Sequence, residues 1–84
     1  MKKTLLQFVV DAIKNNPNNY LLGEEIRALK DTAEDIMVSD PDDMIGVVLI
    51  LIYIFPNDYD LGQHVRGHLN NFEFFLENVE TDTN

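Results

Sequence analysis

The sequence has no cysteine and few residues that interrupt regular secondary structure. Without cysteine the chain can form no disulfide, thiolate nucleophile or cysteine-ligated zinc site, so its stability must come from packing or association. Glycine and proline together fill seven of the 84 positions, and hydrophobic residues make up 45%. This composition is typical of a globular chain and not of a disordered one. The absence of cysteine also favours a reducing compartment, and we expect a cytoplasmic protein.

Basic residues are scarce, and almost all of them lie near the start of the chain. The net charge is −9; residues 1–30 contribute +2, whereas residues 31–84 contribute −11 and contain Arg66 as their only Lys or Arg. Such a charge distribution disfavours binding to nucleic acid or to anionic lipid and attracts a basic protein partner. We therefore expect neither nucleic-acid binding nor membrane association.

The chain is long enough for one domain, 1–84, and we expect no internal repeat. The apolar start resembles a signal peptide, but Gln7 and Asp11 interrupt it and no small-residue cleavage site follows. Apolar residues at helical spacing, separated by clusters of Asn, Asp and Pro, predict four helices. Their expected ranges are about 4–15, 21–37, 40–55 and 60–80.

The third of these segments is the most apolar. Asp40 and Pro41 provide a predicted N-cap and first helical position, but the run from Met44 to Phe55 is apolar all round and could equally be a buried strand. We favour a helix because a single strand would have no ladder partner in the chain. The predicted fold is all-α, a four-helix bundle with a strongly apolar third helix at its centre, which is either fully wrapped or partly exposed as a docking patch.

Signs of catalysis or metal binding are weak. Asp60, His64 and His68 are spaced four apart and could approach a zinc ion, but a tetrahedral site needs a fourth ligand that nothing specifies. We take these residues as weak candidates only and expect no metal and no cofactor. The chain also lacks a phosphate-binding loop and a Ser-His-Asp set, Ser39 being its only serine, so we expect no enzymatic activity.

Acidic and aromatic residues point instead to protein binding. Acids run through the second predicted helix and resume at the start of the fourth, and two tyrosines lie close to them in sequence. Charged runs are often no more than solvated faces, but interface hot spots are typically a few aromatics within a polar rim. The candidate partner-binding residues are Asp31, Glu34, Asp35, Tyr53, Asp58 and Tyr59. Phe74 points away from the apolar stripe of the last helix and is a candidate for self-association.

This layout resembles the immunity proteins of colicin- and pyocin-type nuclease bacteriocins. The similarity lies in the segment 5–9, in the acids of the second predicted helix and in the segment 51–56, Leu-Ile-Tyr-Ile-Phe-Pro. The sequence departs from the family pattern at Ile54 and Phe55, where a second tyrosine would stand. The resemblance implies an acidic four-helix protein that neutralises a basic nuclease toxin in the cytoplasm of the producer, with Tyr53 as an anchoring contact.

The leading hypothesis is thus a stoichiometric inhibitor of a basic protein, such as a nuclease toxin. One alternative is a DNA mimic whose carboxylates stand in for phosphates and block a nucleic-acid-binding protein. Another is a homo-oligomeric module, for instance a homodimer, that uses the third predicted helix or Phe74.

Overall fold

The structure, a computed structural model, describes the backbone of residues 2–83 and the side chains of residues 5–77. Within that range the fold is all-α, as predicted, but it contains six helices and not four. They are α1 (Lys2–Asn15), α2 (Asn19–Ala28), α3 (Lys30–Ser39), α4 (Asp43–Ile54), α5 (Asp58–Gly67) and α6 (Leu69–Thr83). None of them is both long enough and apolar enough to cross a membrane.

The two additional helices arise because the predicted helices 21–37 and 60–80 are each broken once. The breaks fall at Leu29 and His68, whose amides donate to the carbonyls three residues earlier, Ile26 and Val65, at 3.0 Å. Such a tight last turn redirects the chain within a single residue. Apolar residues stay in phase across each break, so periodicity alone could not reveal it.

Two predicted helix starts also move. Asp42, not Asp40, caps α4: its carboxylate accepts hydrogen bonds from the amides of Met44 and Ile45 at 2.9 and 3.1 Å. Asn57 in the same way caps α5, accepting from Tyr59 and Asp60. A short side chain caps where the backbone is extended, and the sequence offered several candidates for each position.

The chain consists of two matching halves, so the expectation of no internal repeat was wrong. Residues 17–27 and 56–66 share Pro, Asn, Tyr, Leu, Gly and Arg at six of eleven positions, at an offset of 39. Each half is a helix, an Asn-capped second helix, a one-residue break and a third helix. The contacts match as well, since α1 packs on α6 while α4 packs on α3.

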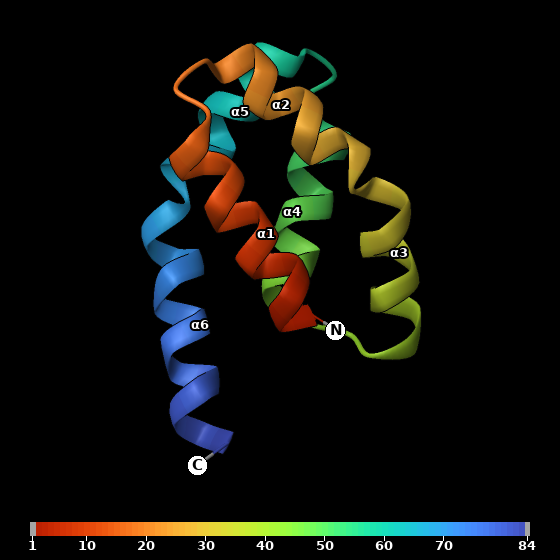
Figure 1. Ribbon diagram of the computed structural model, residues 1–84. Helices are drawn as coiled ribbons and strands as arrows, with labels where there is room; N and C mark the ends of the chain where they lie inside the picture. The colour runs from red at the N-terminus through yellow and green to blue at the C-terminus, as the bar shows by residue number, and fades with distance from the viewer. Residues whose placement is uncertain (1, 84) are drawn as a thin grey trace.

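The halves meet where α2 crosses α5, at the end of the molecule shown at the top of Figure 1. This is the most extensive contact between helices. Gly23 and Gly62 allow the backbones to touch: a Cβ on Gly23 would lie 1.8 Å from the carbonyl oxygen of Asp58, and one on Gly62 would lie 1.9 Å from that of Asn19. The reciprocity of these contacts places the two halves around an approximate two-fold axis.

Below this crossing, α1 and α4 lie between the outer helices α6 and α3 (Figure 1). The core is formed by matching apolar positions of the two halves, such as Val9 with Val48 and Leu22 with Leu61. The apolar segment 44–55 is helical as far as Ile54, in agreement with the prediction, but it is not fully wrapped. Ile50, Tyr53 and Ile54 are exposed by 56%, 61% and 59%.

Candidate functional site

Four of the six predicted partner-binding residues lie on α3 and the neighbouring face of α4. Asp31 and Asp35 are exposed on α3, one helical turn apart, and Glu34 lies between them, half-exposed and turned towards α4. The Tyr53 hydroxyl of α4 donates a hydrogen bond to the Glu34 carboxylate. A residue from each helix is thereby held across the α3–α4 contact, with the tyrosine ring left open to solvent.

Lys30 completes this arrangement. Its ammonium group lies 3.5 Å from the Glu34 carboxylate and 5.4 Å from the centre of the Tyr53 ring. The ammonium charge thus sits over the aromatic face, where the ring quadrupole attracts it. We call Lys30, Glu34 and Tyr53 the tyrosine cluster.

The electrostatics of the tyrosine cluster follow from these contacts. The hydrogen bond from Tyr53 lowers the pKa of Glu34 below its ordinary value of 4.5, and the same hydrogen bond raises the pKa of Tyr53 above 10.0. The carboxylate of Glu34 raises the pKa of Lys30. Near neutral pH, the cluster therefore contains a carboxylate, an ammonium and a neutral phenol.

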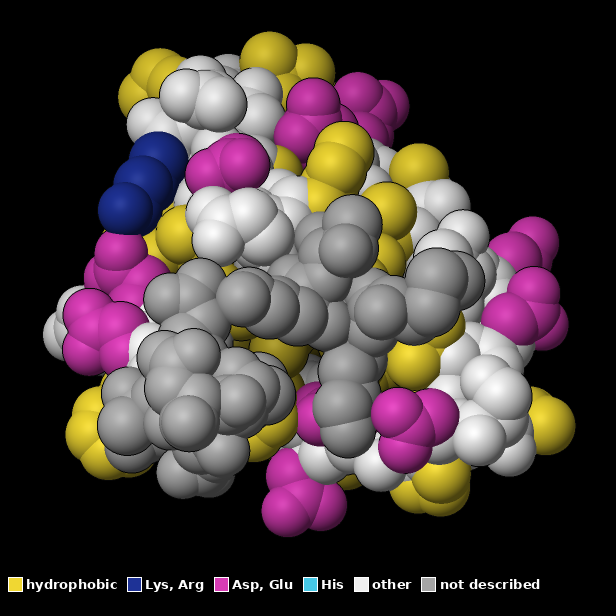
Figure 2. Space-filling model, turned by 60° about the horizontal axis from the view of Figure 1, so that its bottom comes forward, with side chains coloured by type: hydrophobic (Ala, Val, Ile, Leu, Met, Phe, Trp, Pro, Cys, Tyr) yellow, Lys and Arg dark blue, Asp and Glu magenta, His cyan; other side chains and the backbone are white. Residues whose placement is uncertain are grey.

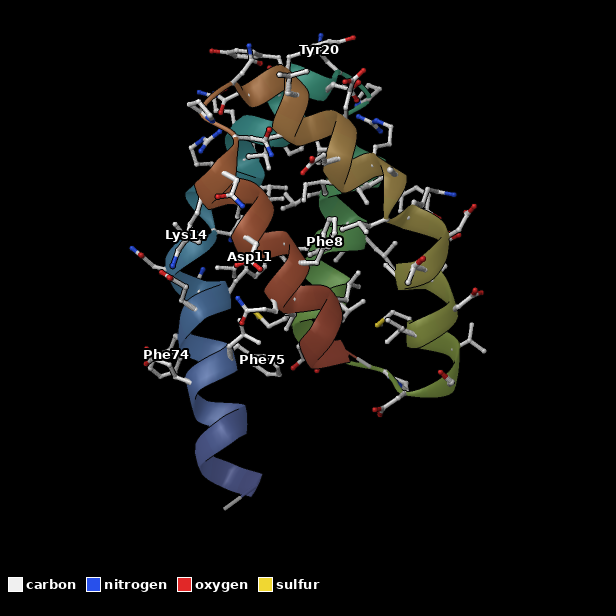
Figure 3. All side chains as sticks on the ribbon, viewed as in Figure 1. Phe8, Asp11, Lys14, Tyr20, Phe74 and Phe75 are labelled. Atoms are coloured by element: carbon white, nitrogen blue, oxygen red, sulfur yellow. The ribbon has the colours of Figure 1, made fainter. Side chains whose placement is uncertain are left out.

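The other two predicted residues, Asp58 and Tyr59, lie at the α2–α5 crossing. Asp58 is half-buried, and its carboxylate accepts from Arg27 Nε at 2.6 Å. Tyr59 is exposed by 51%, and Tyr20, at the matching position of the first half, is exposed by 50%. Figure 3 places Tyr20 at the outer end of the crossing, beyond α1. The structure thus divides the predicted residues between two regions instead of joining them in one.

The arginines at this crossing were not singled out from the sequence. Arg27 donates to the carbonyls of Ile52 and Phe55 at 3.4 and 2.8 Å, at the carboxyl end of α4. Arg66 makes the matching contacts at the carboxyl end of α1, donating to the carbonyls of Ile13 and Asn16 and, at 2.8 Å, to the Asn19 side chain. The shared Pro-Asn-x-Tyr-x-Leu-Gly…Arg pattern was the available signal. Both side chains are committed to holding the halves together.

The weak metal candidates Asp60, His64 and His68 do not converge. His64 stacks on Phe55, with ring centres 3.9 Å apart, and its Nδ1 lies 2.8 Å from the Asp60 carbonyl oxygen. His68 lies at the break after α5, where the helix that would align it with His64 has ended. Among the side chains described, no three of His, Asp and Glu are arranged to hold a metal ion.

The self-association candidate Phe74 is exposed by 68% on α6 and points away from the body of the molecule (Figure 3). Figure 2 turns the lower end of the molecule forward, and there acidic side chains occur around the rim whereas basic ones appear at one side only. The acidic character deduced from the sequence is thus seen around the rim of this end.

Comparisons with protein-family models, with curated proteins and with solved structures find no match to this chain.

Proposed function

We propose that this chain is a stoichiometric inhibitor of a basic protein, of the immunity or antitoxin type, and that its target is a nuclease toxin. The observation that supports this most directly is the tyrosine cluster: an exposed aromatic ring is fixed by Glu34 beside the exposed acids Asp31 and Asp35. An aromatic anchor inside a charged rim is the arrangement that protein interfaces use for their strongest contacts.

In the proposed mechanism, the negative potential of the chain first steers a basic partner towards α3. Steering of this kind raises the association rate and is weakened by salt. The partner then packs on the Tyr53 ring, whose hydrogen bond to Glu34 reduces the rotamer freedom that would otherwise be lost on binding. No covalent chemistry is required, because occupying a nuclease surface is enough to exclude its substrate.

The test begins with the immobilised full-length chain and a lysate of its native host. We expect it to retain a basic protein with nuclease activity, and we expect that activity to fall to zero as the purified chain reaches a one-to-one ratio. Tyr53→Ala should abolish both retention and inhibition. Lys14→Ala, at the matching position of the other half, is the control and should leave both unchanged.

Retention of an acidic protein, or nuclease activity that persists in excess chain, would contradict the proposal. Competition with duplex DNA distinguishes a DNA mimic, because a mimic bound in a nucleic-acid groove is displaced by DNA in a salt-dependent way.

A further inference from the structure

The two-fold repeat supplies an internal comparison between α1 and α4. These helices occupy matching places in their halves, and their buried positions agree: Val9 matches Val48, and Ile13 matches Ile52. Their outward positions differ. At three of these positions α1 has the exposed polar residues Asp11, Lys14 and Asn15, and the matching residues on α4 are Ile50, Tyr53 and Ile54. At a fourth position both helices are apolar, because Phe8 on α1, exposed by 50%, matches the half-exposed Val47 on α4.

The fold does not require apolar residues at these outward positions. Asp11 and Lys14 leave α1 packed in its place, as Figure 3 shows on the side of the molecule facing the viewer. At the equivalent places on α4, Ile50 and Ile54 are therefore not needed for packing, and Tyr53 contributes to the scaffold through its hydroxyl, which is bonded to Glu34. About 60% of each of these three side chains is left in contact with water, at a cost that only a partner would recover.

The flanks of the two helices differ in the same direction. Where α1 is bordered by a hydrogen bond from Asn16 to Glu25 at 3.1 Å, α4 is bordered by the stack of Phe55 on His64. Below Ile50 on α4 lies the half-exposed Val47. We define the α4 face by these residues together: Val47, Ile50, Tyr53, Ile54, Phe55 and His64.

Charge decides between a second copy and a different partner. The α4 face is bordered by Glu34 on α3 and by the exposed Asp43 at the start of α4, and Lys30 is the nearby basic residue in the part of the chain described. Two copies meeting through this face would bring two acidic rims together in a molecule of net charge −9. A partner with basic residues around an apolar centre would gain both apolar packing on the α4 face and electrostatic attraction to its acidic border.

We infer that the α4 face is the docking surface for an apolar patch bordered by Lys and Arg on a partner protein, and that each chain binds one such partner because the matching α1 face is polar at every position except Phe8. This rests on the proposed function and specifies its site and stoichiometry. The expected complex is one-to-one despite the two-fold scaffold.

The probe is a synthetic amphipathic helical peptide of Leu and Lys, titrated into the ¹⁵N-labelled full-length chain. Backbone resonances of residues 47–55 and of His64 should shift, whereas those of residues 8–16 should not. A peptide of the same pattern with Glu in place of Lys should bind at least about tenfold more weakly. Ile54→Asp should weaken binding of the Lys peptide by about tenfold or more, and Asn15→Asp should leave it within about twofold.

Placing the α4 residues at the matching positions of α1 should create a second binding surface. The triple variant Asp11→Ile, Lys14→Tyr, Asn15→Ile should bind a second peptide on α1, so that the number of peptides bound per chain rises from one to two. Equal shifts on both faces of the unmodified chain, equal affinity for the Glu peptide, or a chain dimer abolished by Ile50→Asp would each overturn the inference. If the peptide binds α4 and the lysate yields no nuclease, the docking surface stands and the proposed target fails. If a nuclease is retained equally well by Ile54→Asp, the proposed target stands and the α4 face fails as its docking surface.

Discussion

Arg27 and Arg66 each bind the carboxyl end of the first helix of the opposite half. The exchange is reciprocal: Arg27 holds the end of α4, and Arg66 holds the end of α1. A guanidinium group suits this role because it donates in several fixed directions at once, to two carbonyls and one side chain.

Replacing either arginine by lysine should therefore destabilise the protein although the charge is kept. An ammonium group cannot reach two carbonyls and a side chain in this geometry, so each variant leaves half-buried acceptors without a donor. We expect Arg27→Lys and Arg66→Lys each to lower the free energy of unfolding by about 2 kcal/mol, measured by urea denaturation. Glu24→Gln, on the exposed side of α2, is the control. Unequal effects of the two arginine variants would argue against a two-fold role.

Alanine at the two crossing glycines should be more damaging. A Cβ at Gly23 or Gly62 would overlap a backbone carbonyl that cannot move without separating α2 from α5. We expect Gly23→Ala and Gly62→Ala each to cost at least about 2 kcal/mol. Gly46→Ala is the matched control: its Cβ would meet only Met37 Cε, at 3.6 Å. Within a helix that substitution should stabilise by about 0.5–1 kcal/mol, and thermal unfolding of the three variants checks the ranking.

The hydrogen bond between Tyr53 and Glu34 predicts a pH dependence with two limits. The folded pKa of Glu34 is lowered, so its contribution to stability is present above pH 4.5 and is lost as the pH falls through the folded pKa. The folded pKa of Tyr53 is raised, so its contribution is present below pH 10.0 and is lost as the pH rises through the folded pKa. The stability difference between the unmodified chain and Tyr53→Phe should therefore form a plateau that falls at both ends. A difference independent of pH would exclude this hydrogen bond in solution.

Exposed acids of α3 should act on the rate of association. Asp31→Asn and Asp35→Asn each remove one charge and leave the hydrogen bond between Tyr53 and Glu34 in place, so they should slow association with a basic partner by about twofold to fivefold and reduce its salt dependence. Dissociation should change little. Stopped-flow measurements at several salt concentrations separate the two rates, and an unchanged salt response would count against steering by α3.

Much of the fold could be predicted from the sequence because its apolar residues recur at helical spacing. Leu22, Ile26, Ala33 and Ile36, which recur at helical spacing in the predicted helix 21–37, form one stripe and are buried. The one-residue breaks could not be seen, since the same stripe continues across Leu29. The repeat was obscured because clear identity is confined to the segment around the crossing, whereas α1 and α4 share only their inward pattern.

The candidate site was predicted in part. Glu34 and Tyr53 were chosen for charge and aromaticity, and they meet although 19 residues separate them in the chain. Ile50 and Ile54 were missed, since an apolar helix gives no sign of which side its neighbours leave uncovered. Asp58 was chosen for its charge, which Arg27 neutralises across a contact between the two halves.

The reciprocal arginines have a further consequence for how the molecule opens. Because Arg66 of the second half holds the end of α1 and Arg27 of the first half holds the end of α4, both helix ends lose these hydrogen bonds when the halves separate. The amides of α1 and α4 should therefore lose their protection from hydrogen exchange together, in a single opening event. A destabilising substitution in one half should reduce the protection of the other half to the same extent.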